Sequence, residues 1–153
     1  MKLFPWQKQK EFFTAPQKEQ LVEAIRNAEM RTSGEIRLFV ESKCRFVDPM
    51  DRAREIFLQL GMEKTDERNA TLVYVAVKDR QAVVLGDQGI HQKVQQPYWE
   101  AEVKKMLLYF RSEQLTEGLC NIITDIGEAL HFHFPYSAEH DKNELPDEIV
   151  FGR

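Results

Sequence analysis

The chain has 153 residues, of which 42% are apolar and 30% are charged, a length and composition typical of one soluble globular domain. Its formal net charge is −4, and residues 139–153, with five acids and two bases, contribute −3 of it. Nucleic-acid binding usually requires a strongly basic face. This balance of charge therefore argues against a nucleic-acid-binding protein.

No stretch of the sequence approaches the roughly 20 apolar residues that a membrane-spanning helix needs. Polar residues also follow Lys2, where a signal peptide would be apolar. We therefore expect a cytoplasmic protein without a membrane span. Cys44 and Cys120 stand far apart and form no Cys-x-x-Cys pair. This favours two reduced thiols, buried or half-buried, over a disulfide.

We predict three segments: an N-terminal leader over residues 1–13, an α/β domain over 14–135, and an acidic C-terminal tail over 136–153. The leader holds aromatic residues among lysines, namely Phe4, Trp6, Phe12 and Phe13. Two interpretations are open, an arm that binds a membrane surface or a partner, and a lid that folds back on the core. The lid is favoured, because large apolar patches are seldom left exposed.

Thr14-Ala15-Pro16-Gln17 resembles a capping box with proline in the first turn, and predicts the start of a helix. An apolar stripe at helical spacing follows before Ser33-Gly34, formed by Leu21, Val22, Ile25 and Ala28. The stretch from Glu35 to Glu41 then alternates between apolar and other residues. It predicts a strand with one face buried and one partly buried, near an edge of the sheet.

A second helix is predicted to start at Asp48-Pro49 and to end at Gly61, with an inward face formed by Ala53, Ile56, Phe57 and Leu60. The run Ala70–Val77 is almost continuously apolar, which indicates a strand covered on both faces at the centre of an α/β sheet. In such a strand–helix–strand unit the strands should be parallel and the crossover right-handed. The polar break at 78–80 predicts a hairpin, so residues 82–85 should return antiparallel.

Two further helices are predicted, from about Pro97 to Ser112 and from about Thr116 to His133, where Phe134-Pro135 ends the second. The first should bury Trp99, Val103, Met106, Leu107 and Phe110, and the second Leu119, Ile122, Ile123, Ile126 and Leu130. In the tail, residues Ser137–Lys142 should be mobile. The apolar residues that end the stretch Leu145–Phe151 should dock on the body or add an edge strand.

Common catalytic signatures are absent from the sequence, including the phosphate-binding Gly-x-x-x-x-Gly-Lys loop, the Gly-x-Ser-x-Gly elbow and His-Glu-x-x-His. No catalytic residue can be named. His131 and His133 could suggest a metal pair, but residues i and i+2 of a helix point to different faces. Histidines that complement the C-terminal dipole of the helix are the favoured interpretation.

Polar residues at three strand ends are predicted to gather at one end of the sheet. Glu35 opens the first strand, Asn69 precedes the second, and Asp87 closes the third, within the glycine loop Gly86–Gly89. Three oxygen-bearing side chains beside a loop with unhindered carbonyls would suit Ca²⁺ or Mg²⁺. On the residues alone, strand capping by the same side chains remains the commoner alternative. A second acidic set, Asp48, Asp51 and Asp79, falls at the opposite end.

The chain also resembles a known family, the TPM domain. The resemblance rests on Thr32-Ser33-Gly34-Glu35-Ile36, on the run from Arg68 to Val75, and on Gly86-Asp87-Gln88-Gly89-Ile90. The segments Glu117-Gly118-Leu119 and Asn143–Ile149 extend it from Phe12 to Ile149. The chain looks like the short bacterial branch of the family.

This resemblance implies a three-layer α/β/α sandwich around a small mixed sheet of about four strands. It also implies a divalent-cation site near Gly86 and Gly89, matched here by Glu35, Asn69 and Asp87, and a proposed acid phosphatase activity. Many members carry a glutamate and an aspartate where this chain has His91 and Gln95-Gln96-Pro97. Without those two carboxylates, we expect a weak site for Ca²⁺ or Mg²⁺.

Two function classes follow from these observations. The first is a non-enzymatic binding module with a weak divalent-cation site, which could hold a protein partner through its acidic tail. The second is a metal-dependent phosphomonoesterase, in which the cation would polarise a phosphoryl oxygen or activate water. The binding module leads, because the sequence offers no evident nucleophile or general acid. We expect the protein to be a monomer.

Overall fold

The computed structural model describes residues 12–46, 48–111, 114–136 and 149–152. Within them, four strands form one sheet in the order β3-β2-β1-β4. The strands are β1 (Glu35–Glu41), β2 (Ala70–Ala76), β3 (Gln81–Gly86) and β4 (Ile149–Phe151). β1 is parallel to β2 and β4, and β2 is antiparallel to β3. The sheet is therefore mixed, and the predicted hairpin is confirmed.

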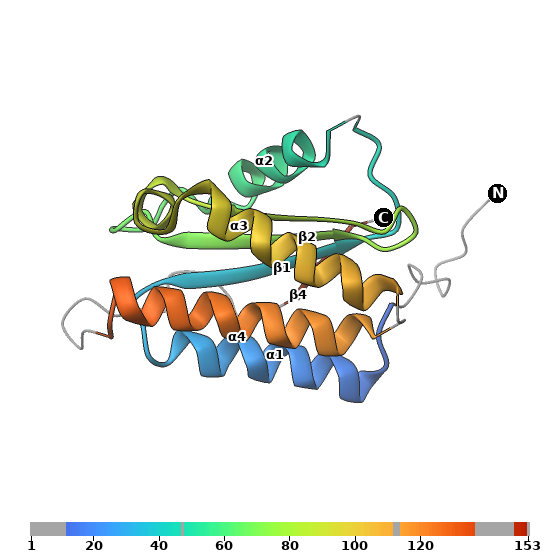
Figure 1. Ribbon diagram of the computed structural model, residues 1–153, viewed down its shortest axis with the longest axis horizontal. Coiled ribbons are helices and arrows are strands. Elements are labelled where there is room, and N and C mark those ends of the chain that lie inside the picture. The colour runs from blue at the N-terminus through green and yellow to red at the C-terminus, as the bar shows by residue number, and fades with distance from the viewer. Residues whose placement is uncertain (1–11, 47, 112–113, 137–148, 153) are drawn as a thin grey trace.

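Helices cover both faces of this sheet, as Figure 1 shows. α2 (Pro49–Gln59) packs on one face, while α1 (Ala15–Glu29), α3 (Gln88–Arg111) and α4 (Leu115–His133) pack on the other. The predicted α/β/α sandwich is confirmed. α1 and α4 lie side by side, and Gly127 permits their close approach, because a Cβ there would lie 2.6 Å from the Cβ of Ala28.

β2 is the strand with both faces buried, as its apolar run predicts. All seven of its residues are buried. Val73 and Val75 belong to the core shared with α1, α3 and α4, whereas Leu72 and Tyr74 belong to the core under α2. Such burial on two faces explains why the run lacks the apolar–polar alternation of a surface strand.

The first two helices begin and end as their sequences predict. At α1, the Thr14 side chain accepts a hydrogen bond from the Gln17 amide at 3.2 Å, and the Gln17 side chain accepts one from the Thr14 amide at 2.8 Å. At α2, the Asp48 carboxylate accepts from the Met50 amide at 2.9 Å. Gly61, just beyond α2, has a φ of 68°, a conformation that glycine adopts without strain.

The prediction that the Glu35–Glu41 strand lies near an edge is wrong. β1 lies inside the sheet, between β2 and β4, and all seven of its residues are buried. The alternation misleads here because Glu35, Arg37 and Glu41 are polar side chains in buried positions. The edge position belongs to β4, which confirms that Ile149–Phe151 docks as an edge strand.

α3 starts earlier than predicted and is broken in the middle. It begins at Gln88, and Gln95 has non-helical angles, φ 64° and ψ 172°. The break places Pro97 in the first turn of the second half, where its missing N–H costs little. The first half was not predicted, because Ile90 is its one fully buried apolar residue. Leu107, predicted to be buried, is exposed.

α4 matches its prediction, and all five apolar residues named for it are buried. Phe13 is also buried, and its ring and that of Phe12 pack against Phe151 of β4.

Cys44 and Cys120 are half-buried free thiols, as predicted. None of the described helices has the length and apolar character needed to cross a membrane. Phe4, Trp6 and the stretch 137–148 lie outside the described residues.

Phe151→Ala tests how much the C-terminal strand contributes to stability. Phe151 is half-buried and contacts two aromatic rings, so the variant should lose about 1–3 kcal/mol of unfolding free energy. Urea unfolding measures this loss. Tyr136→Ala is the control, because Tyr136 is exposed and its removal should change stability by less than about 0.5 kcal/mol. Equal effects of the two variants would contradict the docking of β4.

Candidate functional site

The structure brings Glu35, Asn69 and Asp87 to one end of the sheet. Glu35 pairs in register with Ala70, Asn69 precedes Ala70, and the Asp87 amide donates to the Ala70 carbonyl at 2.8 Å. The three residues therefore surround one backbone position. Their exposed fractions are 2%, 1% and 7%, so their oxygens are largely withdrawn from water. We call this end of the sheet the Glu35 edge.

The glycines of the predicted loop have a packing role at this edge. The Gly89 amide donates to the Arg68 carbonyl at 2.8 Å. A Cβ on Gly89 would lie 2.2 Å from the Glu67 carbonyl oxygen, and one on Gly86 would lie 2.3 Å from the Trp99 ring. A side chain on Gly89 would push the loop away from the backbone that precedes β2, and one on Gly86 would collide with the Trp99 ring of α3. The loop therefore needs glycine for close approach at both positions.

Arg68, which sequence reasoning did not single out, forms an ion pair with the Asp87 carboxylate. Its Nε lies 2.6 Å from Asp87 Oδ2 and its second terminal nitrogen lies 2.8 Å from Oδ1, a two-point ion pair. The hydrogen bond to Asp87, and then its charge, raise the pKa of Arg68. Asp87 Oδ1 also accepts from the Gln88 amide at 2.8 Å, at the start of α3. Asp87 therefore ties the sheet to the helix as well.

Among the three predicted ligands, Asn69 has a buried side-chain oxygen without a hydrogen bond from the described residues. Its amide nitrogen donates to Ser33 Oγ and to Glu67 Oε2, each at 3.2 Å. Its Oδ1 is buried and accepts no hydrogen bond from any described residue. Leaving such an oxygen unpaired is costly. A cation would satisfy it.

The oxygen donors of the Glu35 edge fit Ca²⁺ or Mg²⁺ in type, since both prefer carboxylate and amide oxygens. A cation that binds Asp87 would have to displace the Arg68 guanidinium, because Arg68 now pairs with that carboxylate. Within the described residues, no three His, Cys, Asp or Glu side chains gather in a way that could hold a metal. The edge therefore offers two carboxylates and one amide oxygen, a small set of ligands.

The second acidic set, at the opposite end of the sheet, is used structurally. Asp48 caps α2, Asp51 pairs with Arg54 at 3.2 Å, and the Asp79 carboxylate accepts from the Cys44 amide at 2.6 Å. A buried network lies beside them, in which Tyr74 and Arg52 both donate to Glu41. Burial and the bond to Glu41 raise the pKa of Tyr74.

The two histidines at the end of α4 have separate surroundings. His131 Nδ1 lies 2.8 Å from the Arg31 carbonyl oxygen. The His133 ring packs edge-on against Phe132, with 4.8 Å between their centroids. These contacts agree with a role at the helix end.

Glu102, which sequence reasoning also missed, is a buried carboxyl between α3 and α4, 3% exposed. Its Oε1 lies 3.3 Å from Lys105 Nζ, which also contacts Asp125 Oδ2 at 3.0 Å. Burial, followed by the hydrogen bond and charge of Asp125, raises the pKa of Glu102 to about 7. Its spacing from Trp99 and Met106, three and four residues, was the available signal, because it places an acid on the inward stripe.

Comparisons with known proteins agree with this fold. The family model of the TPM domain matches residues 7–129. The NMR structure of the BA42 protein from the psychrophilic bacterium Bizionia argentinensis is 39% identical, with a TM-score of 0.85, over 95% of this chain and 99% of that chain.

A second solved structure, the N-terminal domain of the cg2496 protein from Corynebacterium glutamicum, is 13% identical. It covers 78% of this chain and 74% of that chain with a TM-score of 0.62, a likeness of fold alone. No curated protein matches the chain.

Glu102→Gln should make stability less dependent on pH. The raised pKa means that folding favours the protonated carboxyl, so stability is lost as pH rises from about 4.5 towards 7. The neutral variant avoids this loss and should gain about 1–2 kcal/mol relative to the native protein between about pH 4.5 and pH 8.

Urea unfolding at several pH values measures this gain, with Glu100→Gln, exposed on the same helix, as the control. A difference between Glu102→Gln and the native protein that stays constant with pH would contradict the burial of an ionisable Glu102.

Proposed function

The chain belongs to the TPM domain family, and on that premise we propose that it is a binding module that takes up Ca²⁺ or Mg²⁺ weakly at the Glu35 edge. The ligands are Glu35, Asn69 and Asp87, beside the loop from Gly86 to Gly89. The observation that carries this proposal is the buried Asn69 Oδ1, which accepts no hydrogen bond from any described residue. Two buried carboxylates flank the same backbone position.

In this proposal the cation exchanges with the Arg68 guanidinium. Asp87 is 7% exposed and cannot remain charged at low cost without a partner. Arg68 supplies that partner in the absence of a cation, and its partly exposed side chain can swing away when a cation arrives. The exchange keeps Asp87 neutralised in both states. It also makes the site weak, because the cation must compete with a two-point ion pair.

A metal-assisted phosphomonoesterase is the second candidate, and one observation favours it. The Ser33 hydroxyl donates to Glu67 Oε2 at 2.6 Å at the border of the Glu35 edge, a hydroxyl–carboxylate pair of the kind that activates a nucleophile. Its other side-chain hydrogen bond among the described residues is with Asn69. No general acid accompanies the pair in these contacts, so the binding module leads. Mg²⁺-dependent hydrolysis of p-nitrophenyl phosphate that is lost in Ser33→Ala and Asp87→Ala would reverse that order.

Saturating Ca²⁺ should raise the thermal stability of the native protein. We expect a dissociation constant on the order of 10⁻⁴–10⁻³ M, as at weak calcium modules. At ten times that concentration, mass action adds about 1.4 kcal/mol to the unfolding free energy. Asp87→Asn should remove most of the gain, whereas Asp66→Asn, an exposed control on the preceding loop, should keep it. Thermal melts with and without Ca²⁺ measure the effect, and an unchanged gain in Asp87→Asn would exclude the site.

Arg68→Gln should tighten Ca²⁺ binding several-fold, because it removes the competing guanidinium. Without Ca²⁺ the variant should melt at a lower temperature than the native protein, since Asp87 loses its partner, and Ca²⁺ should recover more stability than in the native protein. Arg26→Gln removes an exposed pair with Glu23 and is the control. The calcium dependence of the melting temperature gives both affinities. Weaker Ca²⁺ binding by Arg68→Gln would contradict exchange with Arg68.

A further inference from the structure

A cavity of about 330 Å³ lies at the end of β1 opposite the Glu35 edge, near the lower end of the size range of small-molecule sites. Its lining consists of Glu41, Lys43, Arg45, Phe46 and Arg52, so most of its lining residues are basic. We call it the basic cavity. Because it shares no residue with the Glu35 edge, a ligand here would bind independently of a cation there.

Glu41, the acid in this lining, is already neutralised. Arg52 donates from Nε and Nη2 to the two Glu41 oxygens, each at 2.9 Å, and the Tyr74 hydroxyl donates to the same carboxylate. Arg52 also pairs with Glu55 at 2.5 Å, and the central carbon of its guanidinium lies 5.9 Å from the centre of the Phe46 ring. Arg52 therefore has partners on every side, and it helps to form the wall of the cavity rather than a free binding group.

Lys43 and Arg45 are the basic groups of the lining that remain unpaired. Both side chains are exposed, and neither forms an ion pair with another described residue. The residue between them, Cys44, is anchored, because its amide donates to the Asp79 carboxylate at 2.6 Å. Lys43 and Arg45 both line the cavity from this anchored segment. The cavity therefore presents two unpaired positive charges on neighbouring side chains.

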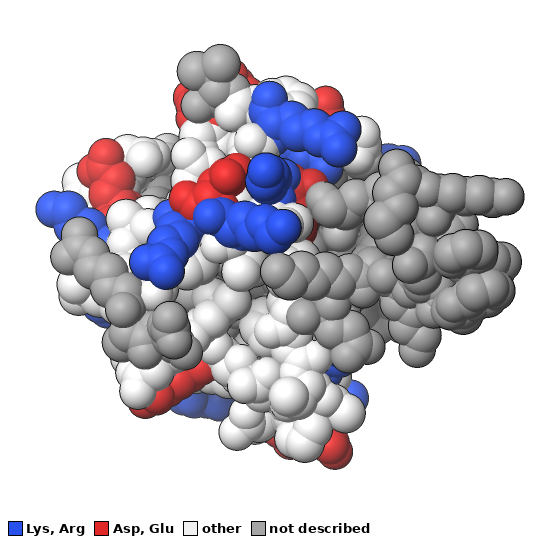
Figure 2. All heavy atoms as spheres, turned by 90° about the vertical axis from the view of Figure 1, so that its right-hand side faces the viewer, with Lys and Arg blue, Asp and Glu red and all other residues white. Residues whose placement is uncertain are grey.

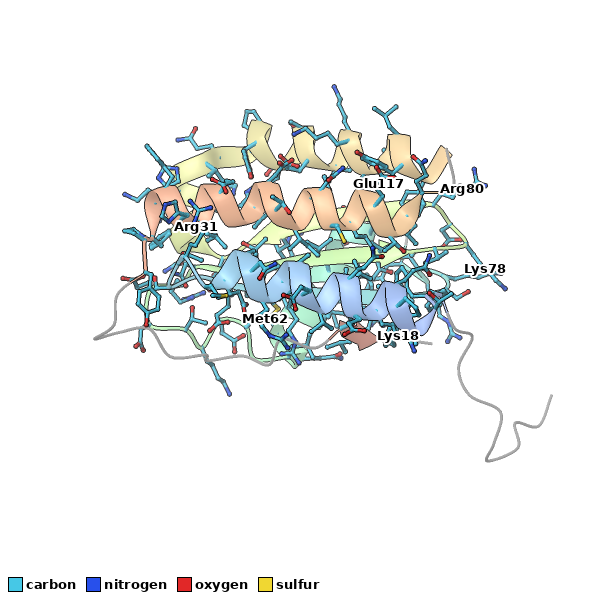
Figure 3. All side chains as sticks on the ribbon, turned by 90° about the horizontal axis from the view of Figure 1, so that it is seen from below. Lys18, Arg31, Met62, Lys78, Arg80 and Glu117 are labelled. Carbon is cyan, nitrogen blue, oxygen red and sulfur yellow. The ribbon has the colours of Figure 1, made fainter. Side chains whose placement is uncertain are left out.

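The hairpin between β2 and β3 adds positive charge beside the cavity. The Lys78 amide donates to the Ser42 carbonyl at 2.8 Å, which holds the hairpin next to the segment after β1. Lys78 and Arg80 are exposed, and Figure 3 shows both at this end of the molecule, far from Arg31. Figure 2 faces this end and shows Lys and Arg side chains gathered on it. The surface around the basic cavity therefore attracts anions.

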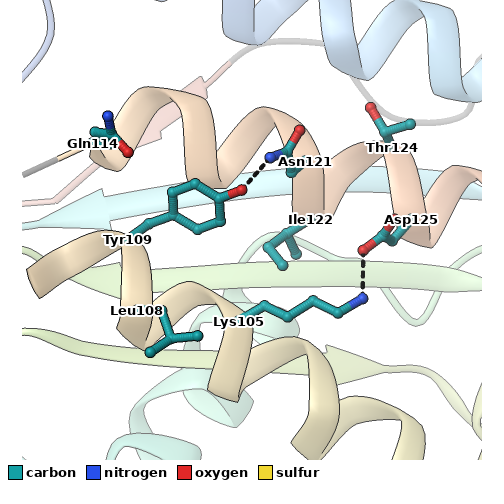
Figure 4. A pocket seen from close by; sticks show the side chains of 8 residues that line it. All are labelled: Lys105, Leu108, Tyr109, Gln114, Asn121, Ile122, Thr124 and Asp125. Carbon is teal, nitrogen blue, oxygen red and sulfur yellow. Dashed lines mark hydrogen bonds and ion pairs between the residues drawn. The ribbon is translucent and has the colours of Figure 1, made fainter. Parts of the chain in front are cut away.

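Charge and shape together indicate the chemistry of the ligand. Two unpaired cations on separate side chains suit a ligand with two separate negative groups, because charge-assisted hydrogen bonds are the strong ones. The Phe46 ring, 38% exposed, offers an apolar wall to a short carbon skeleton. The larger groove between α3 and α4 offers no comparable free charge, because Lys105 there pairs with Asp125 at 3.0 Å (Figure 4).

We propose that the basic cavity binds small dicarboxylate anions. One carboxylate accepts two hydrogen bonds from the Arg45 guanidinium, whose planar fork matches a carboxylate. The other carboxylate accepts from the Lys43 ammonium, and the carbon skeleton between them lies against Phe46. The small volume of the cavity selects a short skeleton and excludes a macromolecular anion.

Titration with succinate at about pH 7.5, where carboxyl groups are ionised, tests the proposal by amide NMR. Succinate should give saturable shifts at Lys43, Arg45 and Phe46. Butyrate has the same number of carbon atoms with a single carboxylate, and it should bind about tenfold more weakly, because one charged hydrogen bond is missing. Added NaCl should weaken succinate binding by screening. Equal affinity for butyrate, or shifts that gather away from the cavity, would overturn the proposal.

Inorganic phosphate distinguishes a dicarboxylate site from a general site for anions. It carries its charge on one compact group without a carbon skeleton, so it cannot reach both cations and Phe46 together. Phosphate should therefore bind more weakly than succinate at the same ionic strength. Phosphate affinity equal to or above that of succinate would show an adventitious anion site and overturn the proposal.

Lys43→Gln and Arg45→Gln should each reduce succinate affinity about tenfold. Because both side chains are exposed and unpaired, neither variant should change the melting temperature measurably, so the loss cannot be ascribed to unfolding. Lys64→Gln and Arg26→Gln are the matched controls, exposed on other parts of the molecule, and should bind succinate like the native protein. Native affinity in both Lys43→Gln and Arg45→Gln would exclude the basic cavity as the site.

Discussion

The double pairing of β2, with β1 on one side and β3 on the other, is the constraint on which the rest of the structure depends. It buries the run from Ala70 to Ala76 on both faces and requires helices on both sides of the sheet. This pairing also determines which residues lie together at each end of the sheet. Two parallel strands that begin together, and an antiparallel neighbour that ends there, bring Glu35, Asn69 and Asp87 around Ala70.

At the same edge, the residues proposed to bind a cation also have structural roles. Asp87 accepts a hydrogen bond from the first amide of α3, pairs with Arg68 and is one of the proposed cation ligands. Gly89 lets the loop reach the backbone before β2, which no side chain would permit. Because Asp87 and its neighbours have structural partners already, a cation at this edge can only be a competing partner. The weakness of the proposed site follows from this competition, in addition to the small number of carboxylates.

Much of the fold could be predicted because its signals are local. The capping box at Thr14, the Asp48 cap and the continuous apolar run of β2 each depend on neighbouring residues alone. The errors came from tertiary packing. β1 reads as an edge strand because its buried polar residues find partners that the sequence does not show. Pro97 marked the second half of α3, but the first half has one fully buried apolar residue, Ile90, and so gave no helical pattern. Arg68 and Glu102 were missed for the same reason, since each takes its importance from residues on another element.

Mapping Ca²⁺ binding residue by residue with amide NMR tests whether a cation binds at the Glu35 edge in exchange with Arg68. Binding at this edge should give saturable shifts at Glu35, Asn69, Asp87 and Gly89, together with a change in the Arg68 Nε–H signal as its hydrogen bond to Asp87 opens. Shifts that gather instead at Asp48, Asp51 and Asp79 would place the cation at the opposite end of the sheet and contradict it.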